Sequence, residues 1–280
     1  MIILAATPIG NLGDASPRLV EHLTNARFIA AEDTRSLLKL ANMLGIKLAA
    51  KLFSLHEHNE GDRIEQLLEI AATEDVLVVS DAGMPTVSDP GFLLVRAAVA
   101  AGIDVTIIPG PSAVLSALAV SGLPTDRFSF EGFLPRKQGE RTRLFTGLLA
   151  ETRTMVFFES PHRILESLEA ALAVFGPARQ ASVSRELTKK FEHTERGTLP
   201  QLVEWAKTEP KGEMVLVVAG AQEGEHKAID VVDQVIALVD AGNKLKPAVA
   251  QVAEQAGVSK SELYQLVLDS RKGNAPQSLN

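Results

Sequence analysis

The sequence predicts an α/β protein in which two α/β domains are followed by a small C-terminal helical tail. Short apolar or β-branched runs alternate with amphipathic stretches, a pattern typical of a largely parallel sheet covered by helices. A breaker-rich joint at 122–125 interrupts this pattern, which then begins again, and the composition changes near Gly220. We therefore expect domains at 1–122 and 123–222 and a tail at 223–280.

Five runs are expected to form the strands of the first domain. They are residues 2–6, 28–31, 51–55, 76–80 and 105–110. Ser16-Pro17 and Asp89-Pro90 each place a capping side chain before a proline at a first helical turn, and Gly45 and Gly102 follow helices as C-terminal caps. These signals predict where two helices begin and where two end.

Four later runs predict the strands of the second domain. They are residues 127–133, 154–160, 181–187 and 213–220. Ser160-Pro161 is expected to open a helix that Gly176-Pro177 closes, and a further helix is expected from Thr198 to Lys207. The second domain therefore also alternates strands with helices.

The tail is expected to be helical after a linker at 220–227. Ala253, Gly257 and Leu263 have the spacing of a helix-turn-helix. The spacing alone favours a structural helical hairpin or a dimer interface, because the charge is only weakly basic. The alternative is nucleic-acid contact through Lys244, Lys246, Ser259, Lys260 and Tyr264. We expect residues 271–280 to be disordered.

Composition excludes several classes of protein. The chain has 280 residues, of which 46% are hydrophobic and 22% charged, so it can bury a sizeable core. The absence of cysteine excludes disulfides, Cys-ligated zinc and a thiolate nucleophile, and favours a reducing compartment. The N-terminus has no basic region or apolar stretch of signal-peptide length, so we expect a soluble cytoplasmic protein. A net charge of -7 disfavours uniform nucleic-acid binding but allows local basic patches.

Four segments place Gly, Pro and small polar residues directly after an expected strand. They are residues 7–16, 80–91, 109–113 and 158–163. Open α/β sheets bind ligands at such positions. None of the four contains a dinucleotide-binding G-x-G-x-x-G or a phosphate-binding G-x-x-x-x-G-K-[ST], which disfavours nicotinamide cofactors and nucleoside triphosphates. The loops therefore predict another small ligand.

The loop at 80–91 suits a cationic or amphoteric ligand because it carries two aspartates. Asp89 precedes Pro90 and is interpreted as a helix cap, whereas Asp81 has no such structural explanation. The amides of Ser112 and Ala113 could bind a carboxylate at a helix start, or the segment could be an ordinary tight turn.

Neighbouring strand ends carry groups that could act as general bases or bind a polar acceptor. These groups are Glu32, Asp33, Arg35, His56, Glu57, His58 and Glu60. The His-x-His pair could bind a metal, but no third ligand has a recognisable spacing, so a metal site is the less favoured interpretation. Within the fourth loop, Glu159, His162 and Arg163 are candidates. A Ser-His-Asp hydrolase is disfavoured because no serine lies in G-x-S-x-G.

A basic run could bind phosphate. Arg136, Lys137, Arg141 and Arg143 are accompanied by the single acid Glu140. The usual alternative is a solvated helix start. Lys189 and Lys190 form a second, smaller cluster.

Nine motifs occur in one order along the chain. They are ATPIGNLGD, AAEDTR, LHEHNE, VSDAGMPTVSDPG, IPGPSA, GLPTDRFSFEGFLPRK, FFESPHR, SRELTK and KGEMVLVVAG. Each motif is weak, but the ordered set is similar to the ribosomal RNA small subunit methyltransferase I family, a branch of the tetrapyrrole methylase fold. The resemblance covers residues 2–220 densely and the tail more loosely.

The resemblance implies S-adenosylmethionine as methyl donor, held in a cleft between two α/β domains, and a homodimer. It also implies 2′-O-methylation of a cytidine ribose in the decoding region of 16S ribosomal RNA in the small ribosomal subunit. The positions it implies for the cofactor are Ile9, Asp81, Ala82, Gly83, Gly110, Ser112, Ala113, Glu159, Leu187, Gly212 and Glu213. No metal is implied.

A ribose hydroxyl is a poor nucleophile until a base takes its proton. With the family in view, our hypothesis is that Asp33 or Glu159 is this base, that Arg35 and Arg163 position phosphate or the developing alkoxide, and that His56 and His58 orient the acceptor. The residues expected to contact RNA are Arg136, Lys137, Arg141, Arg143, Arg163, Lys189, Lys244, Lys246 and Lys260. The alternatives are a small-molecule C-methylase of tetrapyrrole type and an RNA-binding assembly factor without catalysis.

Overall fold

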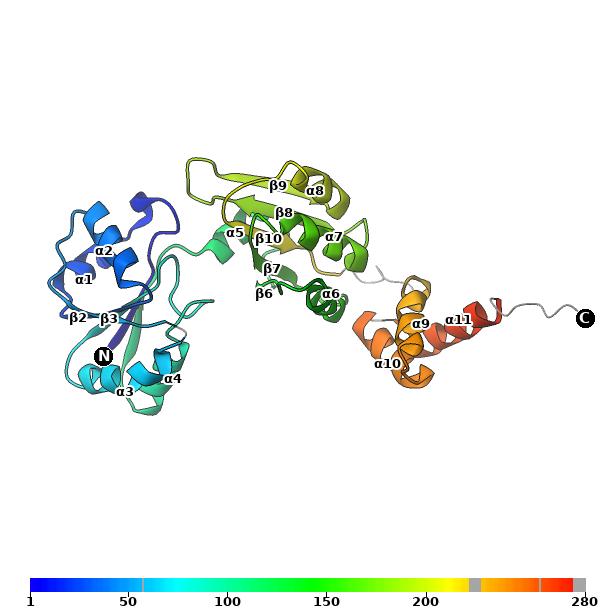
Figure 1. Ribbon diagram of the computed structural model, residues 1–280, viewed down its shortest axis with the longest axis horizontal. Coiled ribbons are helices and arrows are strands. Elements are labelled where there is room, and N and C mark those ends of the chain that lie inside the picture. The colour runs from blue at the N-terminus through cyan, green and yellow to red at the C-terminus, as the bar shows by residue number, and fades with distance from the viewer. Residues whose placement is uncertain (57, 222–227, 257, 274–280) are drawn as a thin grey trace, which may run out of the picture. The chain divides into compact units, whose positions relative to one another are not determined.

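The computed structural model describes residues 1–56, 58–221, 228–256 and 258–273 (Figure 1). These residues form two compact units. The first contains Met1–Ser121, Val183–Thr194 and Lys211–Leu216, and the second contains Gly122–Ser182, Glu195–Pro210 and the described residues from Val217 onward. The domain division that we expect at 122/123 and 222/223 stays a prediction.

The first unit contains a parallel sheet of five strands. They are β1 (Ile2–Ala5), β2 (Phe28–Ala31), β3 (Lys51–Ser54), β4 (Val76–Val79) and β5 (Val105–Ile108), in the order β3-β2-β4-β1-β5. Leu4 of the interior strand β1 is in register with Val78 of β4 and with Ile107 of β5 on its two sides. All four residues of β1 and of β4 are buried, as expected of parallel strands covered on both faces. The five expected strands are confirmed.

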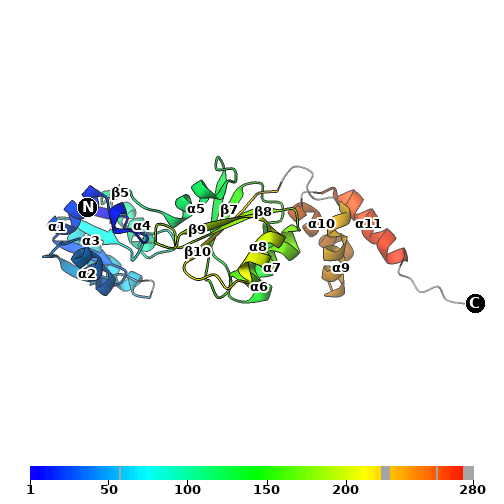
Figure 2. The same cartoon turned by 90° about the horizontal axis from the view of Figure 1, so that it is seen from above.

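Helices cover both faces of this sheet (Figures 1 and 2). They are α1 (Pro17–Asn25), α2 (Thr34–Met43), α3 (Glu60–Ala71) and α4 (Phe92–Ala100). A short 3-10 helix at Leu12–Asp14 precedes α1, and α5 (Ala113–Ser121) follows β5. Leu19 and Leu37 of α1 and α2 belong to the core on one face, and Leu67 and Leu94 of α3 and α4 belong to the core on the other. The alternation of side chains along each strand supplies both layers.

Most of the expected helix boundaries in this unit are confirmed. The Ser16 hydroxyl accepts from the Leu19 amide at 3.1 Å, with Pro17 as the first helical residue. Gly45 and Gly102 follow α2 and α4 with φ of 72° and 69°.

The cap predicted at Asp89 is wrong. Helix α4 begins at Phe92, after Gly91 with φ of 116°. The amides of Gly91 and Leu94 donate to Glu60 Oε1 at 3.1 and 3.0 Å. The start of α4 is therefore capped by a buried carboxylate from α3 and not by Asp89.

A second sheet has the strand order β6-β7-β10-β8-β9. Its strands are β6 (Phe128–Phe133), β7 (Thr154–Glu159), β8 (Gln180–Arg185), β9 (His193–Thr198) and β10 (Met214–Val218), and its helices are α6 (Gln138–Gly147), α7 (Ile164–Phe175) and α8 (Leu199–Ala206). Thr198 and Gln201 form a capping box at α8, and Gly176 ends α7 with φ of 83°, which confirms both predictions. The start of α7 predicted at Ser160 is wrong, because residues 160–163 form a turn in which the Arg163 amide donates to Ser160 O at 3.1 Å.

The tail forms a small helical bundle. A 3-10 turn (Ala228–Val231) precedes α9 (Val232–Asp240), α10 (Leu245–Ala256) and α11 (Lys260–Gly273). Ala253 and Leu263 are buried, as the helix-turn-helix spacing predicts, whereas Gly257 and the linker residues 222–227 lie outside the described residues. The disorder predicted from residue 271 is wrong for 271–273, which continue α11, and residues 274–280 lie outside the described part. Of the helices in the described ranges, none has the length and apolar composition needed to cross a bilayer.

Candidate functional site

Two of the expected ligand loops are joined at the carboxyl ends of β1 and β4. The Thr7 amide donates to Gly83 O at 2.9 Å, and the Gly83 amide donates to Thr7 O at 3.1 Å. The buried Thr7 hydroxyl also donates to Ser80 O at 3.2 Å. Loops 7–16 and 80–91 therefore begin as a fixed backbone pair.

Small residues let a third loop approach the same place. A Cβ added at Gly83, whose φ is 84°, would lie 3.4 Å from Ile9 Cγ2 and 3.8 Å from Pro111 O. A Cβ added at Gly110 would lie 2.9 Å from Ala6 Cβ, closer than real Cβ atoms come. The structure thus brings together Ile9, Gly83 and Gly110, which the resemblance assigned to the cofactor.

The other expected cofactor residues of these loops flank this contact. Ala82 and Asp81 are exposed, directly before Gly83. Ser112 precedes α5, where its carbonyl accepts from the Ser116 amide at 2.9 Å and its hydroxyl from the Leu115 amide at 3.4 Å. Ala113 is the first residue of α5. A helix start of this kind offers free amides to an anionic group.

Carboxylates gather beside these loops. The Asp81 amide donates to Glu32 Oε2 at 3.2 Å, and the Asp81 carboxylate accepts from the Asp33 amide at 3.2 Å and from the Ser36 hydroxyl at 3.3 Å. Asp81 is therefore held against the segment that joins β2 to α2.

Asp33 is poorly suited to the role of general base. Its carboxylate accepts from the Arg35 amide at 2.8 Å, as the N-cap of α2, and from the Arg35 guanidinium at 2.7 Å. The Arg35 side chain holds the pKa of Asp33 down at about 2. A carboxylate with this pKa accepts a proton poorly near neutral pH.

Asp89 has the opposite electrostatic environment. Burial, followed by the nearby charge of Glu32, raises the pKa of Asp89 to about 7, although a hydrogen bond from Ser80 opposes the rise. Burial also raises the pKa of Glu32. A pKa near the operating pH is what general-base catalysis requires. Sequence reasoning missed Asp89 because the following Pro90 made it look like a helix cap.

The segment after β8 belongs to the same compact unit. Leu187 is buried, and a Cβ added at Gly212 would lie 2.2 Å from Glu186 Cγ. Lys189 Nζ lies 3.0 Å from Glu186 Oε1 and 2.9 Å from Glu213 Oε2. These two ion pairs compensate the charge of Lys189, and the RNA-binding role predicted for it stays a prediction.

Glu159, in the second compact unit, is committed to local structure. Its side chain is buried and accepts from the Ser160 amide at 2.7 Å, from the Arg163 guanidinium at 2.6 Å and from the Ser167 hydroxyl at 2.5 Å. Arg163 also donates to Leu134 O at 3.2 Å. These contacts tie the end of β7 to α7, and they leave Glu159 with little capacity to act as a base.

The basic run divides into exposed and buried members. Arg136, Lys137 and Arg143 are exposed, and Lys137 is paired with Glu140 at 3.1 Å. The RNA-binding role predicted for Arg141 is wrong, because its side chain is only 1% exposed and lies 3.2 Å from Glu166. In the tail, Lys244, Lys246 and Lys260 are exposed.

The histidines at the end of β3 are exposed. The rings of His56 and His58 are 6.2 Å apart, and the His56 amide donates to Asn59 Oδ1 at 2.8 Å. Glu57 lies outside the described residues. Within the described ranges, no three His, Asp or Glu side chains are grouped closely enough to hold a metal ion.

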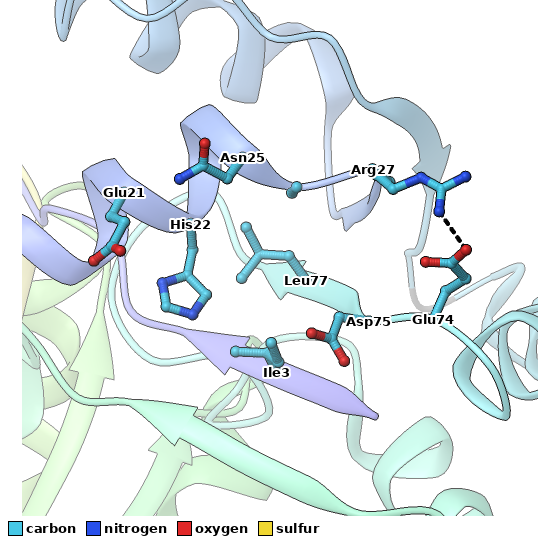
Figure 3. Close-up of a pocket in the computed structure, with 9 residues that line it drawn as sticks. Ile3, Glu21, His22, Asn25, Arg27, Glu74, Asp75 and Leu77 are labelled. Carbon is cyan, nitrogen blue, oxygen red and sulfur yellow. Dashed lines mark hydrogen bonds and ion pairs between the residues drawn. The ribbon is translucent and has the colours of Figure 1, made fainter.

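A separate cavity of about 290 Å³ lies at the opposite ends of the strands (Figure 3). Its lining includes Glu21, His22 and Asn25 from α1 and Arg27 and Asp75 from the segments just before β2 and β4. The Arg27 guanidinium is paired with Glu74 at its rim. Because parallel sheets bind ligands at the carboxyl ends of their strands, we do not assign this cavity to the site formed by the loops.

Known sequences resemble nearly the whole chain. The family model described as Tetrapyrrole (Corrin/Porphyrin) Methylases matches residues 1–203. The protein named "Ribosomal RNA small subunit methyltransferase I" from Mycobacterium tuberculosis (strain CDC 1551 / Oshkosh) is 46% identical over 274 residues, which cover 97% of this chain and 95% of that protein. A protein of the same name from Escherichia coli O157:H7 is 42% identical over 274 residues, covering 96% of this chain and 95% of that one.

Solved structures share the fold at low sequence identity. The methyltransferase CobJ superposes with a TM-score of 0.59 at 21% identity, covering 79% of this chain and 94% of that chain. Diphthine synthase superposes with a TM-score of 0.57 at 16% identity, covering 95% of this chain and 99% of that chain. These likenesses confirm the fold class.

Proposed function

Because the chain belongs to the tetrapyrrole methylase family, and within it to the group of ribosomal RNA small subunit methyltransferases I, we propose that it transfers a methyl group from S-adenosylmethionine to 16S ribosomal RNA in the small ribosomal subunit. The acceptor is the 2′-hydroxyl of a cytidine in the decoding region. The observation that carries the proposal is the 46% identity to a relative of that name over 97% of the chain.

The loops at the carboxyl ends of β1, β4 and β5 fit this cofactor. Gly83 and Gly110 leave the backbone open to a close ligand, and the helix start at Ser112 offers amides to a carboxylate. Asp81 presents a carboxylate that suits a cationic amine. The residues assigned to the cofactor are Ile9, Asp81, Ala82, Gly83, Gly110, Ser112, Ala113, Leu187, Gly212 and Glu213.

When bound, S-adenosylmethionine supplies a methyl group already activated by its sulfonium, so the protein chiefly provides alignment of the acceptor oxygen. The chain itself would supply the base that accepts the proton of the ribose hydroxyl. We favour Asp89 as this base over Asp33 and Glu159. Its raised pKa leaves it able to accept a proton near neutral pH, whereas Arg35 keeps Asp33 a weak base and three donors occupy Glu159.

RNA contact is assigned to the exposed cations of two segments. Arg136 and Lys137 lie just before α6 and Arg143 lies within it, and Lys244, Lys246 and Lys260 lie in the tail. Phosphate recognition by such cations needs no base-specific geometry. Arg35, with its side chain exposed, is assigned to phosphate or the developing alkoxide.

A homodimer and a cytoplasmic location complete the proposal. Ile107 of the edge strand β5 and Leu115 and Val120 of α5 expose apolar side chains, which supports self-association. Light scattering coupled to size-exclusion chromatography measures the mass of the protein in solution and so tests whether it is a dimer. A ribosomal substrate supports a cytoplasmic location.

The test is transfer of radiolabelled methyl from S-adenosylmethionine to small ribosomal subunits that lack their native methylations. Free ribosomal RNA and a tetrapyrrole precursor serve as parallel acceptors. Label that maps to a ribose of 16S RNA is the expected result. Label on the tetrapyrrole alone would make the chain a small-molecule C-methylase, and RNA binding without cofactor binding would make it an assembly factor.

A further inference from the structure

The turn between β8 and β9 displays an aromatic ring and a cation side by side. Phe191 is 64% exposed, more than any other phenylalanine of the chain, and nothing in the fold requires an apolar ring in water. Lys190 Nζ lies 5.5 Å from the centre of this ring, within the range of a cation–π contact. Neither side chain belongs to the site described above.

The turn that carries this pair is held in one conformation. Glu186 and Thr188 adopt left-handed φ of 51° and 65°, which non-glycine residues adopt only where their surroundings fix them. The Thr188 amide donates to Glu192 Oε2 at 2.6 Å, and the Glu192 amide donates to Lys189 O at 3.1 Å. A ring on such a turn loses little conformational freedom when a partner binds.

The acids of the turn have local partners, and Lys190 is exposed beside the ring. Glu186 is paired with Lys189 at 3.0 Å, and the Glu192 carboxylate is occupied by the Thr188 amide. Lys190 is left as the exposed cation next to the ring. A flat apolar surface beside a positive charge matches an unpaired nucleobase and its phosphate.

The same turn lies against the first ligand loop. A Cβ added at Gly10 would lie 2.5 Å from Lys189 Cγ and 3.0 Å from Thr188 Oγ1, so the Lys189 side chain crosses Gly10 directly. Both segments belong to the first compact unit. Gly10 follows Ile9, which the proposed function assigns to the cofactor. The ring is therefore carried by an element that contacts the proposed methyl-transfer site.

We propose that Phe191 and Lys190 form a platform for the RNA substrate, in which the Phe191 ring stacks on an unpaired base near the methylated nucleotide and Lys190 contacts its phosphate. This inference rests on the proposed function. It assigns to the β8–β9 turn the recognition of single-stranded RNA, which basic segments alone do not provide.

Methyl transfer to small ribosomal subunits tests the platform with four variants. Phe191→Ala and Phe191→Leu are expected to raise KM for the subunits by about tenfold, since stacking is worth roughly 5- to 150-fold per base, and Phe191→Trp is expected to stay within about twofold of wild type. Lys190→Ala is expected to reduce the slope of log KM against log salt by about 0.7, the value for one phosphate contact on a single strand.

Two controls separate stacking from other effects. Phe92→Ala removes a ring that is 58% exposed and whose centre lies 5.7 Å from the Arg96 guanidinium carbon. Phe92 therefore matches Phe191 in exposure and in having a cation beside its ring. The KM of Phe92→Ala for the subunits should equal that of wild type. The Kd for S-adenosylmethionine, measured by calorimetry, should be the same in every variant.

An unchanged KM for Phe191→Ala would overturn the platform, as would full activity of Phe191→Leu, which would indicate apolar packing rather than stacking. A weakened Kd for S-adenosylmethionine would equally overturn it, because the ring would then support the cofactor loop. Absence of RNA labelling by the wild-type protein would refute the proposed function itself, a result distinct from these.

Discussion

Replacing Asp89 by asparagine is expected to stabilise the protein more at pH 8 than at pH 5. Burial and the charge of Glu32 raise the pKa of Asp89 from 3.8 to about 7 in the folded protein. Asparagine is neutral at every pH, and it keeps the size and much of the hydrogen-bonding capacity of the protonated acid. The variant therefore isolates the free-energy cost of ionising this side chain.

The sign follows from the direction of the shift. Well below pH 3.8 both the folded and unfolded chains carry a protonated Asp89, and its pKa shift does not change the free energy of unfolding. As the pH rises toward 7, the unfolded chain ionises freely while the folded chain still holds the proton, so the wild-type protein loses stability. Above pH 7 both forms are ionised and the loss is complete.

Between pH 5 and pH 8 the wild-type protein loses at most about 2.7 kcal/mol of its free energy of unfolding through Asp89. This limit comes from the two pH units between pH 5 and the folded pKa of about 7, at about 1.36 kcal/mol each. Asp89 is only partly buried, so solvent screening reduces this figure, and we expect about 1 kcal/mol. Urea unfolding of both proteins at pH 5, 6, 7 and 8 gives the difference directly. The difference in free energy of unfolding between variant and wild type should increase between pH 5 and pH 7 and then stay constant.

Asp33→Asn is the matched control, since its pKa shift has the opposite sign. The Arg35 side chain lowers the pKa of Asp33 to about 2, so the stability it contributes is complete above pH 4 and is lost only in stronger acid. The difference in free energy of unfolding between Asp33→Asn and wild type should therefore be the same at pH 5 and at pH 8. A difference for Asp89→Asn that also stays constant over that range would refute the reasoning.

Three further outcomes follow from contacts in the structure. Gly110→Ala should lower stability by about 1–3 kcal/mol and weaken S-adenosylmethionine binding in calorimetry, because the new Cβ would lie 2.9 Å from Ala6 Cβ. Glu60→Ala should cost about 1–3 kcal/mol in urea unfolding, since two amides at the start of α4 lose their acceptor, and Glu60→Gln should recover part of this. Arg141→Met should leave the affinity for 16S RNA unchanged in a filter-binding assay, whereas Arg143→Ala should weaken it and reduce its salt dependence; the opposite pattern would show that the buried cation binds RNA.

The strands of the first sheet could be predicted because their apolar runs are buried on both faces. Strands β1 and β4, at 2–5 and 76–79, are fully buried, so hydrophobicity alone marks them. Strand β9, at 193–198, was missed. Its sequence HTERGT is polar, and it lies at the edge of its sheet with β8 as its one neighbour, so it needs no apolar run.

Helix starts could be predicted where the capping group is local and not where it comes from another element. Ser16 caps α1 three residues ahead, which a sequence pattern detects. The start of α4 is instead capped by Glu60, which lies 31 residues before Gly91 in the sequence. Likewise, the density of charge around Arg141 is visible in the sequence, but its burial depends on the packing of α6 against α7.

The choice of a base among the carboxylates of this site illustrates the same point in chemical terms. Asp33 and Asp89 are identical side chains that both follow strands of one sheet, and sequence position favoured Asp33. Their surroundings move their pKa values in opposite directions, because Arg35 stabilises one carboxylate while burial and Glu32 destabilise the other. A carboxylate paired with arginine is suited to capping α2, and one held near neutrality is suited to accepting a proton. The environment, more than the residue type, therefore distinguishes Asp89 from Asp33 and supports our proposal that Asp89 is the base.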